Sequence, residues 1–201
     1  MSLTNDVLSF WFEGIDLTRE IEKREVWFKS TPEFDQAIRD NFLAAYEDAA
    51  AGNLDEIKDS REGCLALILI LDQFSRNLFR HDPKAFAADP KAREFARHAM
   101  DKGFDEGLSD YVRVFFYLPF EHSEIFEDQE LALQLFLPMD NEKTTEAAIG
   151  HHDAIARFGR FPHRNAVLGR ENTPEEEEYL KDPPMWGKTA AETEAAELAK
   201  G

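Results

Sequence analysis

The chain has 201 residues, and its 41 acidic against 23 basic side chains give a formal net charge of −18. A chain this acidic is repelled by phosphate backbones and by anionic lipid headgroups, so the sequence predicts no nucleic-acid partner and no membrane partner. With 43% hydrophobic and 12% aromatic residues it can bury a core, which excludes an intrinsically disordered chain. Phenylalanine occurs 17 times, so we expect large rings to dominate the packing.

A single cysteine, Cys64, and the lack of a targeting signal indicate a cytoplasmic protein. One thiol cannot build a disulfide framework, and its aliphatic neighbours predict a small buried hydrophobe and not a reactive group. No basic segment followed by an apolar one begins the sequence. The longest apolar run is far shorter than the ~20 residues that span a bilayer.

Hydrophobic periodicity predicts helices along the first fifty residues. An apolar and aromatic helix covers residues 7–12, and Thr18 is expected to begin a short helix that ends near Phe28. A longer helix begins at residues 30–33, where a hydroxyl cap is followed by proline and glutamate. Its apolar residues recur on one face until Gly52 ends the helix.

The apolar run of residues 64–71 marks the centre of the fold. It is apolar on every face, and no second run of this kind exists to pair with it as a strand, so we interpret it as a helix buried all round. The helical phase continues, so this central helix covers about residues 64–80. Asp59 and Glu62 are the expected capping pair at its beginning.

Further helices follow in the second half of the chain. A strongly aromatic helix covers residues 111–118 until Pro119 kinks or restarts it, and another runs to about Leu137. One more helix spans residues 141–158, and a capping box at Thr173 begins a short one. The chain after this short helix is rich in alanine and glutamate and only weakly amphipathic.

These elements predict an all-α protein of about eight to ten helices in antiparallel pairs. The pair spacing of about 34 residues is typical of tetratricopeptide repeats, although the sequence pattern of such repeats is not legible. We therefore expect a right-handed, tetratricopeptide-like array of helix pairs around the central helix. No glycine- or serine-rich linker divides the chain, so we predict one domain over residues 1–182 and a frayed tail over residues 183–201.

Three polar clusters are candidates for a functional site, because no familiar catalytic motif is present. The first lies on the second half of the central helix, where Asp72, Arg76 and Arg80 recur every four residues and form one stripe. Gln73 and Asn77 flank this stripe. The stripe is either an ordinary ion pair at an exposed helix end or an ionic surface that faces an interior cleft.

The second cluster comes directly after Pro119 and contains Glu121, His122 and Glu124. The two glutamates share a helix face, so they could orient an imidazole or ligate a metal. A di-iron bundle needs Glu-x-x-His motifs, which the sequence lacks. We therefore predict no metal and no cofactor, and we expect these carboxylates to pair with arginines.

The third cluster is an arginine-rich segment in an acidic protein. Residues 157–170 hold four of the 13 arginines and no acidic residue, which leaves a charge of −22 on the rest of the chain. A planar guanidinium holds a carboxylate or a phosphate through two parallel hydrogen bonds, from the chain itself or from a ligand. Asp153 is expected to pair with Arg157. The candidate residues are His151, Arg157, Arg160, His163, Arg164, Asn165 and Arg170.

Several motifs in order resemble those of the bacterial domain-of-unknown-function family 924. They occupy residues 10–12, 27–28, 71–80, 118–124 and 156–165, and the resemblance spans about residues 5–181. Ser75 departs from the family pattern, which typically has proline at this position. The resemblance implies an α-helical fold like that of the tetratricopeptide superfamily. It implies no activity, and it assigns no roles to the residues of these motifs.

The sequence leaves three functions open. The favoured one is a helical binding module whose Arg/His/Glu site takes an anionic small molecule or a peptide carboxylate. The second is an enzyme in which His122 or His163 acts as acid or base on an anionic metabolite, with Glu121 or Glu124 orienting it. The third is a buried salt-bridge network that only fixes how the helices pack. The oligomeric state is not predicted.

Overall fold

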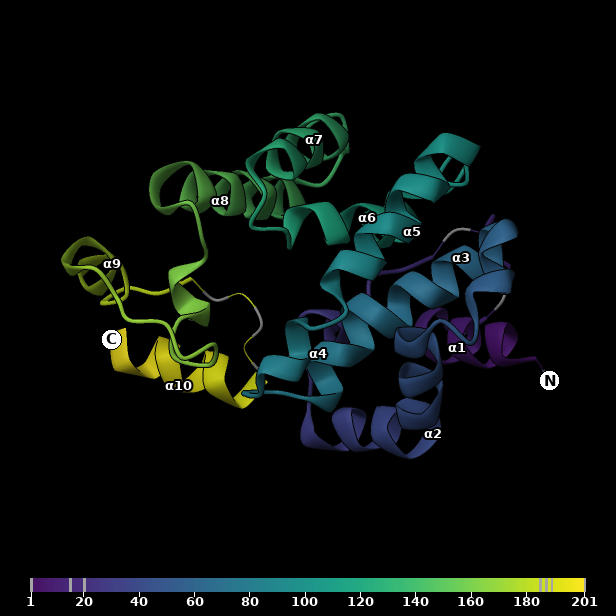
Figure 1. The fold of residues 1–201 in the computed structure, drawn as a ribbon, viewed down its shortest axis with the longest axis horizontal. Helices are drawn as coiled ribbons and strands as arrows, with labels where there is room; N and C mark the ends of the chain where they lie inside the picture. Colours follow the sequence, from purple (N-terminus) through teal and green to yellow (C-terminus); the bar gives the residue numbers. More distant parts are fainter. Residues whose placement is uncertain are drawn as a thin grey trace.

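The computed structural model describes residues 2–14, 16–19, 21–184, 186, 188 and 190–200. All regular structure in this part of the chain is helical. Figure 1 shows α1 and α2 on one side of the molecule and the C-terminal segments, including α9 and α10, on the other. The helix through residues 61–78 begins with α3 on the side of α1 and ends with α4 in the middle of the molecule.

The predicted all-α class is confirmed. The α-helices are α1 (Leu3–Phe12), α2 (Pro32–Ala51), α3 (Arg61–Ile68), α4 (Ser75–Leu78), α5 (Asp89–Lys102), α6 (Asp110–Glu121), α7 (Phe126–Phe136), α8 (Glu142–Phe158), α9 (Pro174–Tyr179) and α10 (Ala190–Lys200). The 3₁₀ turns are η1 (Glu25–Trp27), η2 (Asp55–Asp59), η4 (Pro83–Phe86) and η5 (Pro162–Arg164), and η3 (Leu69–Phe74) is a π-helical turn. The tetratricopeptide-like arrangement and the division after residue 182 stay predictions.

The central helix that the sequence predicts consists of α3, η3 and α4, which follow one another without interruption. All residues from 63 to 75 are buried, so this helix is surrounded by protein on every face. Cys64 belongs to this buried segment, and burial raises the pKa of its thiol to about 12, as expected for an unreactive side chain. The N-cap is Ser60 and not Asp59, because Asp59 lies inside η2 while the extended Ser60 accepts the N–H of Gly63 at 3.1 Å.

Aromatic side chains pack α1, α2 and α6 against the central helix, as the phenylalanine content indicates. The ring centroid of Phe74 lies 4.9 Å from that of Phe42 and 5.6 Å from that of Trp11. Phe115 of α6 meets Trp11 edge to face at 5.4 Å. Such ring pairs add about 0.5–1.5 kcal/mol each beyond the area they bury, so they hold the central helix firmly in position.

Besides the cap at Asp59, two further local predictions differ from the structure. No helix begins at Thr18 in the described residues 16–19 and 21–24, because the Asp16 carboxylate accepts hydrogen bonds from the backbone N–H and hydroxyl of Thr18 and forms a local turn. Of the two alternatives for Pro119, the restart is wrong, since α6 continues through it to Glu121, and the kink stays a prediction. Buried side chains on both sides of Pro119 hold α6 in place, and this packing outweighs the hydrogen bond that proline removes.

The chain after α8 brings Arg164 of the arginine-rich segment against Phe86 of η4 and near Asp89 of α5. α8 ends at Phe158, as the predicted helix over residues 141–158 does, and Gly159 follows it in the left-handed conformation before η5 begins at Pro162. The predicted capping box at Thr173 is present at the beginning of α9. The tail that the sequence predicts to be frayed contains α10, where Thr193 is buried. Among the described helices, none has the length and apolar character needed to cross a bilayer.

Candidate functional site

The site is built around Asp72, which is fully buried in the π-helical turn η3. Such turns are frequently found at functional sites. The Asp72 carboxylate accepts hydrogen bonds from Nδ1 of His122 at 2.8 Å and from Nε2 of Gln73 at 2.6 Å. Nη1 of Arg76 lies 3.3 Å from the same carboxylate. These donors compensate a charge that burial alone would make very unfavourable.

The surroundings leave Asp72 ionised and His122 neutral at neutral pH. Burial raises the pKa of Asp72, but Arg76, His122 and the hydrogen bonds outweigh burial and hold this pKa well below its usual value. Burial lowers the pKa of the His122 imidazole, Arg76 lowers it further, and Asp72 offsets only part of this. A neutral imidazole whose Nδ1–H points at a carboxylate keeps the lone pair of Nε2 for accepting a proton.

Asp89, at the beginning of α5, connects Arg76 with Arg164. Arg76 donates two hydrogen bonds of 3.1 Å, one to each oxygen of the Asp89 carboxylate. Arg164 approaches this carboxylate only to 3.7 Å, which is too long for a hydrogen bond. The sequence does not point to Asp89 as a site residue, because the Asp–Pro pair at this position reads as the start of a helix.

The guanidinium of Arg164 is buried between two aromatic rings and is only partly neutralised. Its central carbon lies 4.5 Å from the ring centroids of both Phe86 and Phe161. Its Nε is buried and has no hydrogen-bond partner among the described residues. Burial and the like charge of Arg76 lower the pKa of Arg164 to about 10, although Asp89 counteracts this. A buried guanidinium that lacks a full set of hydrogen-bond partners is stabilised by an additional negative charge.

His122 and Arg164 line the same open cavity, which has a volume of about 390 Å³. This volume lies within the range of about 300–1,000 Å³ that is usual for small-molecule sites. The lining combines six apolar with six polar residues, so it offers a ligand both apolar contacts and charged groups. The lining residues are Pro83, Phe86, Ala87, Pro90, Ile125 and Leu168, and Asp89, Arg93, His122, Ser123, Glu124 and Arg164.

Glu121 and His151 form a second buried pair next to His122. Nδ1 of His151 is 3.1 Å from Oε1 of Glu121, and the ring of His151 lies 6.2 Å from that of His122. Burial and the charge of Asp72 raise the pKa of Glu121 to about 8, and its Oε2 has no partner in the described part of the chain. Burial lowers the pKa of His151 well below its usual value. At neutral pH this pair is therefore a carboxylic acid beside a neutral imidazole.

Replacing Glu121 by glutamine is expected to remove a pH dependence of stability. The Glu121 carboxyl stays neutral in the fold up to about pH 8, while in the unfolded chain it ionises near its ordinary pKa of 4.5. Its stabilising contribution is therefore complete below pH 4.5 and is lost as the pH rises through 8. We expect Glu121→Gln to gain about 4 kcal/mol over the wild type between about pH 5 and pH 9. Urea unfolding across this pH range measures the difference, and parallel curves for the two proteins would contradict the assignment.

His163 lies beside these rings and not among the residues that line the cavity. Its ring centroid is 5.5 Å from that of Phe161 and 5.6 Å from that of Trp186, and Trp186 also stacks on His151 at 3.6 Å. Burial and the charge of Arg164 lower the pKa of His163 to about 3, so its imidazole is neutral. Of the two histidines that the sequence nominates as acid or base, His122 is the one at the cavity.

Three of the four arginines in residues 157–170 already bind carboxylates of the chain itself. The predicted pair of Asp153 with Arg157 is wrong, because Arg157 instead reaches the first turn of α9. The pairs and their shortest N–O distances are Arg157–Glu175 (2.8 Å), Arg160–Glu176 (2.6 Å) and Arg170–Glu124 (2.7 Å). Within the described chain, Arg164 is the arginine of this segment that has no carboxylate at hydrogen-bond distance.

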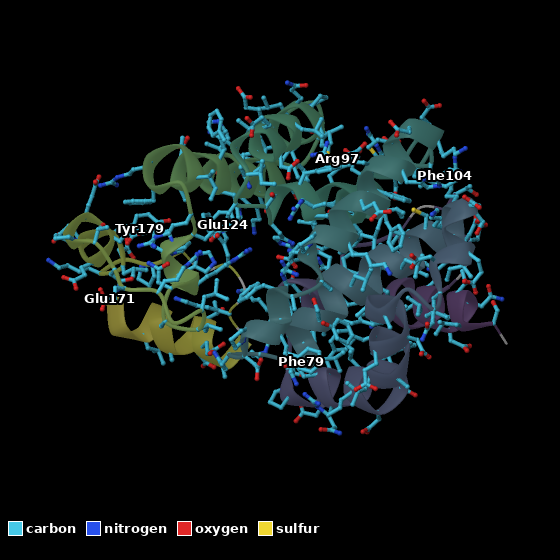
Figure 2. All side chains as sticks on the ribbon, viewed as in Figure 1. Phe79, Arg97, Phe104, Glu124, Glu171 and Tyr179 are labelled. Carbon is cyan, nitrogen blue, oxygen red and sulfur yellow. The ribbon has the colours of Figure 1, made fainter. Side chains whose placement is uncertain are left out.

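Glu124 is held in the wall of the cavity and does not orient His122. Arg170 donates two hydrogen bonds to its carboxylate, at 2.7 and 2.9 Å, and the N–H of Phe161 donates a third at 2.8 Å. Oδ1 of Asn165 accepts a hydrogen bond of 2.9 Å from Nε of Arg170 and so positions this guanidinium. In Figure 2, Glu124 lies on the side of the molecule that faces the C-terminal segments. Among the carboxylates near His122, the one that orients its ring is Asp72.

Asn77 and Arg80 lie outside the cavity lining and bind Asp35 of α2. Nδ2 of Asn77 donates to Asp35 at 2.7 Å, and Nε of Arg80 donates to it at 2.9 Å. Asp72 and Arg76 of the predicted stripe therefore lie at the site, whereas Arg80 joins α2 to the central helix. Asp35 is a further partner that the sequence does not indicate, since it lies more than forty residues before the arginine it binds.

The geometry defines a helical protein with a buried Asp–His pair and a partly neutralised arginine at one open cavity. The chain belongs to a family of bacterial proteins of unknown function, the domain-of-unknown-function family 924, whose model matches residues 7–184. It is similar to the solved structure of a protein of unknown function, ATU0120, from Agrobacterium tumefaciens, with 41% identity and a TM-score of 0.82. This match covers 90% of the present chain and 97% of the other. No curated protein matches the chain.

The resemblance inferred from the sequence motifs is thus confirmed at the level of the family and the fold. Neither comparison assigns a ligand or a reaction to any residue of the site. Among the described residues, no group of three or more histidine, cysteine, aspartate or glutamate side chains is arranged to hold a metal ion.

Proposed function

We propose that this protein binds a small organic carboxylate in the cavity beside Arg164 and His122. The observation that supports this most strongly is the guanidinium of Arg164, which is buried between Phe86 and Phe161 without a full set of partners. Asp89, its nearest carboxylate, lies at 3.7 Å and is already bound by Arg76. A ligand carboxylate would supply the missing hydrogen bonds and neutralise the charge.

The cavity residues other than Arg164 and His122 indicate what the ligand carries besides its carboxylate. Its walls at Phe86, Ile125 and Leu168 are apolar, and burying a hydrocarbon body against them contributes about 25 cal/mol per Å². The volume of about 390 Å³ suits a small molecule better than a folded partner. Asp89 and Glu124 are anionic neighbours of Arg164, so one extra negative charge is favourable while a second would be repelled. These features favour a monocarboxylate over a phosphate dianion.

Isothermal titration with acetate, butyrate, benzoate and phenylacetate at low ionic strength tests the proposal, with neutral benzamide as the ligand control. We expect the wild type to bind benzoate and phenylacetate, and Arg164→Met to weaken this binding at least about tenfold, because a hydrogen-bonded charge pair is lost. Inorganic phosphate is expected to bind more weakly than benzoate.

Arg157→Met is the matched control variant, because Arg157 is half exposed and pairs with Glu175 outside this cavity. It is expected to bind benzoate as the wild type does. Two results would contradict the proposal: no heat from the wild type with any of the four carboxylates, or equal affinities for the wild type and Arg164→Met.

A further inference from the structure

The Asp72–His122 pair has a geometry that binding alone does not require. Nδ1 of His122 lies 2.8 and 3.0 Å from the two oxygens of Asp72, so the carboxylate fixes both the orientation of the ring and its tautomer. Since Nδ1 is occupied, Nε2 is the nitrogen through which His122 can act on a molecule in the cavity that the ring lines. A buried carboxylate behind an imidazole also stabilises the imidazolium that forms when this nitrogen takes a proton.

Neither the hydroxyl residue of the described cavity lining nor the thiol of the chain is placed as a nucleophile, which leaves water as the group that His122 can activate. Ser123 is the one hydroxyl residue among the described lining residues. Its Oγ donates to Asp128 at 2.6 Å and accepts the N–H of Ile125 at 3.1 Å, so it is committed to the beginning of α7. Cys64, the sole thiol of the chain, is buried in the core with its pKa raised to about 12. Neither side chain is placed to act as a nucleophile.

We propose that His122 is the general base of a hydrolase whose substrate carries a free carboxylate, held by Arg164, and an ester bond. Nε2 takes a proton from water as the water oxygen bonds to the ester carbonyl carbon and the carbonyl π electrons move to the carbonyl oxygen. When these electrons return, the bond from carbon to the alkoxy oxygen breaks, and the leaving oxygen takes the proton from the imidazolium. The products are a carboxylic acid and an alcohol, and water is the sole co-reactant. This inference rests on the proposed function, because Arg164 positions the substrate.

Burial and the charges around His122 keep its imidazole unprotonated at neutral pH, so that it can accept a proton. The titratable and charged groups around it are Asp72, Arg76, Asp89, His151 and His163, its chain neighbour Glu121, and Arg93, Glu124 and Arg164 of the cavity lining. Burial and Arg76 together lower the pKa of His122, so the imidazole is already unprotonated at neutral pH. We therefore expect the hydrolysis rate to fall only on the acidic side of the usual titration range of histidine, about pH 6.5.

The mono-4-nitrophenyl ester of glutaric acid tests the inference through the release of 4-nitrophenolate, with 4-nitrophenyl acetate as the ester that lacks a carboxylate. We expect the wild type to hydrolyse the glutarate ester with a kcat/KM at least about tenfold higher than that for the acetate ester. His122→Gln is expected to lower kcat about a hundredfold or more. His152→Gln, on α8 and outside the cavity lining, is expected to leave the rate unchanged.

Two further variants distinguish chemistry from structure. Added imidazole is expected to restore part of the rate in His122→Ala and none in His122→Gln, whose side chain still fills the site. Arg164→Met is expected to raise KM far more than it lowers kcat. Circular dichroism confirms that each variant is folded.

Equal rates for the wild type and His122→Gln, or no hydrolysis above the buffer rate, would overturn the catalytic inference. If hydrolysis fails in this way but the wild type still binds benzoate and Arg164→Met does not, the proposed binding function stands without the catalytic inference. If the wild type neither binds benzoate nor hydrolyses the ester, both the proposed function and the catalytic inference are contradicted.

Discussion

Replacing Arg76 by methionine is expected to lower the free energy of unfolding by about 3–5 kcal/mol, because it leaves buried charge uncompensated. Arg76 neutralises two carboxylates at once. It lies 3.3 Å from Asp72 and donates two hydrogen bonds of 3.1 Å to Asp89. Methionine keeps most of the side-chain volume, so the loss reports the missing guanidinium and not a cavity. Urea unfolding at neutral pH measures it.

Two arginines of the arginine-rich segment, residues 157–170, are the controls for this effect. Arg157 pairs with Glu175 at the surface, so Arg157→Met is expected to change stability by less than about 1 kcal/mol. Arg164→Met is expected to be neutral or stabilising, because Asp89 keeps both hydrogen bonds from Arg76 and a desolvated cation is removed. An Arg76→Met loss no larger than that of Arg157→Met would show that Arg76 does not hold the site together.

Replacing Phe74 by alanine is expected to cost about 3–5 kcal/mol through the cavity left in the aromatic core. Phe74 is fully buried, and its ring lies 4.9 Å from Phe42, 5.6 Å from Trp11 and 6.1 Å from Phe10. It therefore joins both N-terminal helices to the π-helical turn. Since Asp72 belongs to the same turn, the substitution is also expected to weaken benzoate binding even at temperatures where the variant is folded.

Phe28→Ala is the matched control for Phe74→Ala, because the ring of Phe28 is 43% exposed and lies at the edge of the same aromatic group. It is expected to cost less than about 1.5 kcal/mol, as only part of the ring leaves an apolar environment. Thermal and urea unfolding of both variants measure the contrast. Similar losses for the two would mean that Phe74 is not the central ring of the core.

The fold was predictable to the extent that it depends on local patterns. The central helix follows from an apolar run with no strand to pair with it, and the structure buries every residue from 63 to 75. The capping box at Thr173 and the glycine that ends α8 are likewise local signals. The failed helix at Thr18 has an equally local cause, because the Asp16 side chain competes for the same backbone group.

The site was only half predictable, because its decisive contacts join residues far apart in the chain. Asp72 and His122 were both candidates, yet nothing in their spacing pairs them, since 50 residues separate them. Asp89 was missed because its proline neighbour already accounts for it as a helix start. The π-helical turn that contains Asp72 was not predicted, because an apolar run of this kind reads as a regular α-helix.

The arginine-rich segment shows why charge counting alone does not locate a ligand. Its four positive charges appear uncompensated in the sequence, but three of them are bound in the fold by Glu124, Glu175 and Glu176. These three pairs correspond to the structural use of the segment, which the sequence left open beside the binding one. Arg164 differs because two aromatic rings enclose it and no carboxylate reaches hydrogen-bond distance in the described chain.

A crystal structure of the protein with 4-bromobenzoate tests the central claim most directly, because the anomalous signal of bromine locates the ligand independently of the carboxylate. We expect the bromine in the cavity against Phe86 and Leu168, and the carboxylate within hydrogen-bond distance of the Arg164 guanidinium. Bromine found elsewhere on the protein, with only water beside Arg164, would contradict the assignment of this cavity as a carboxylate site.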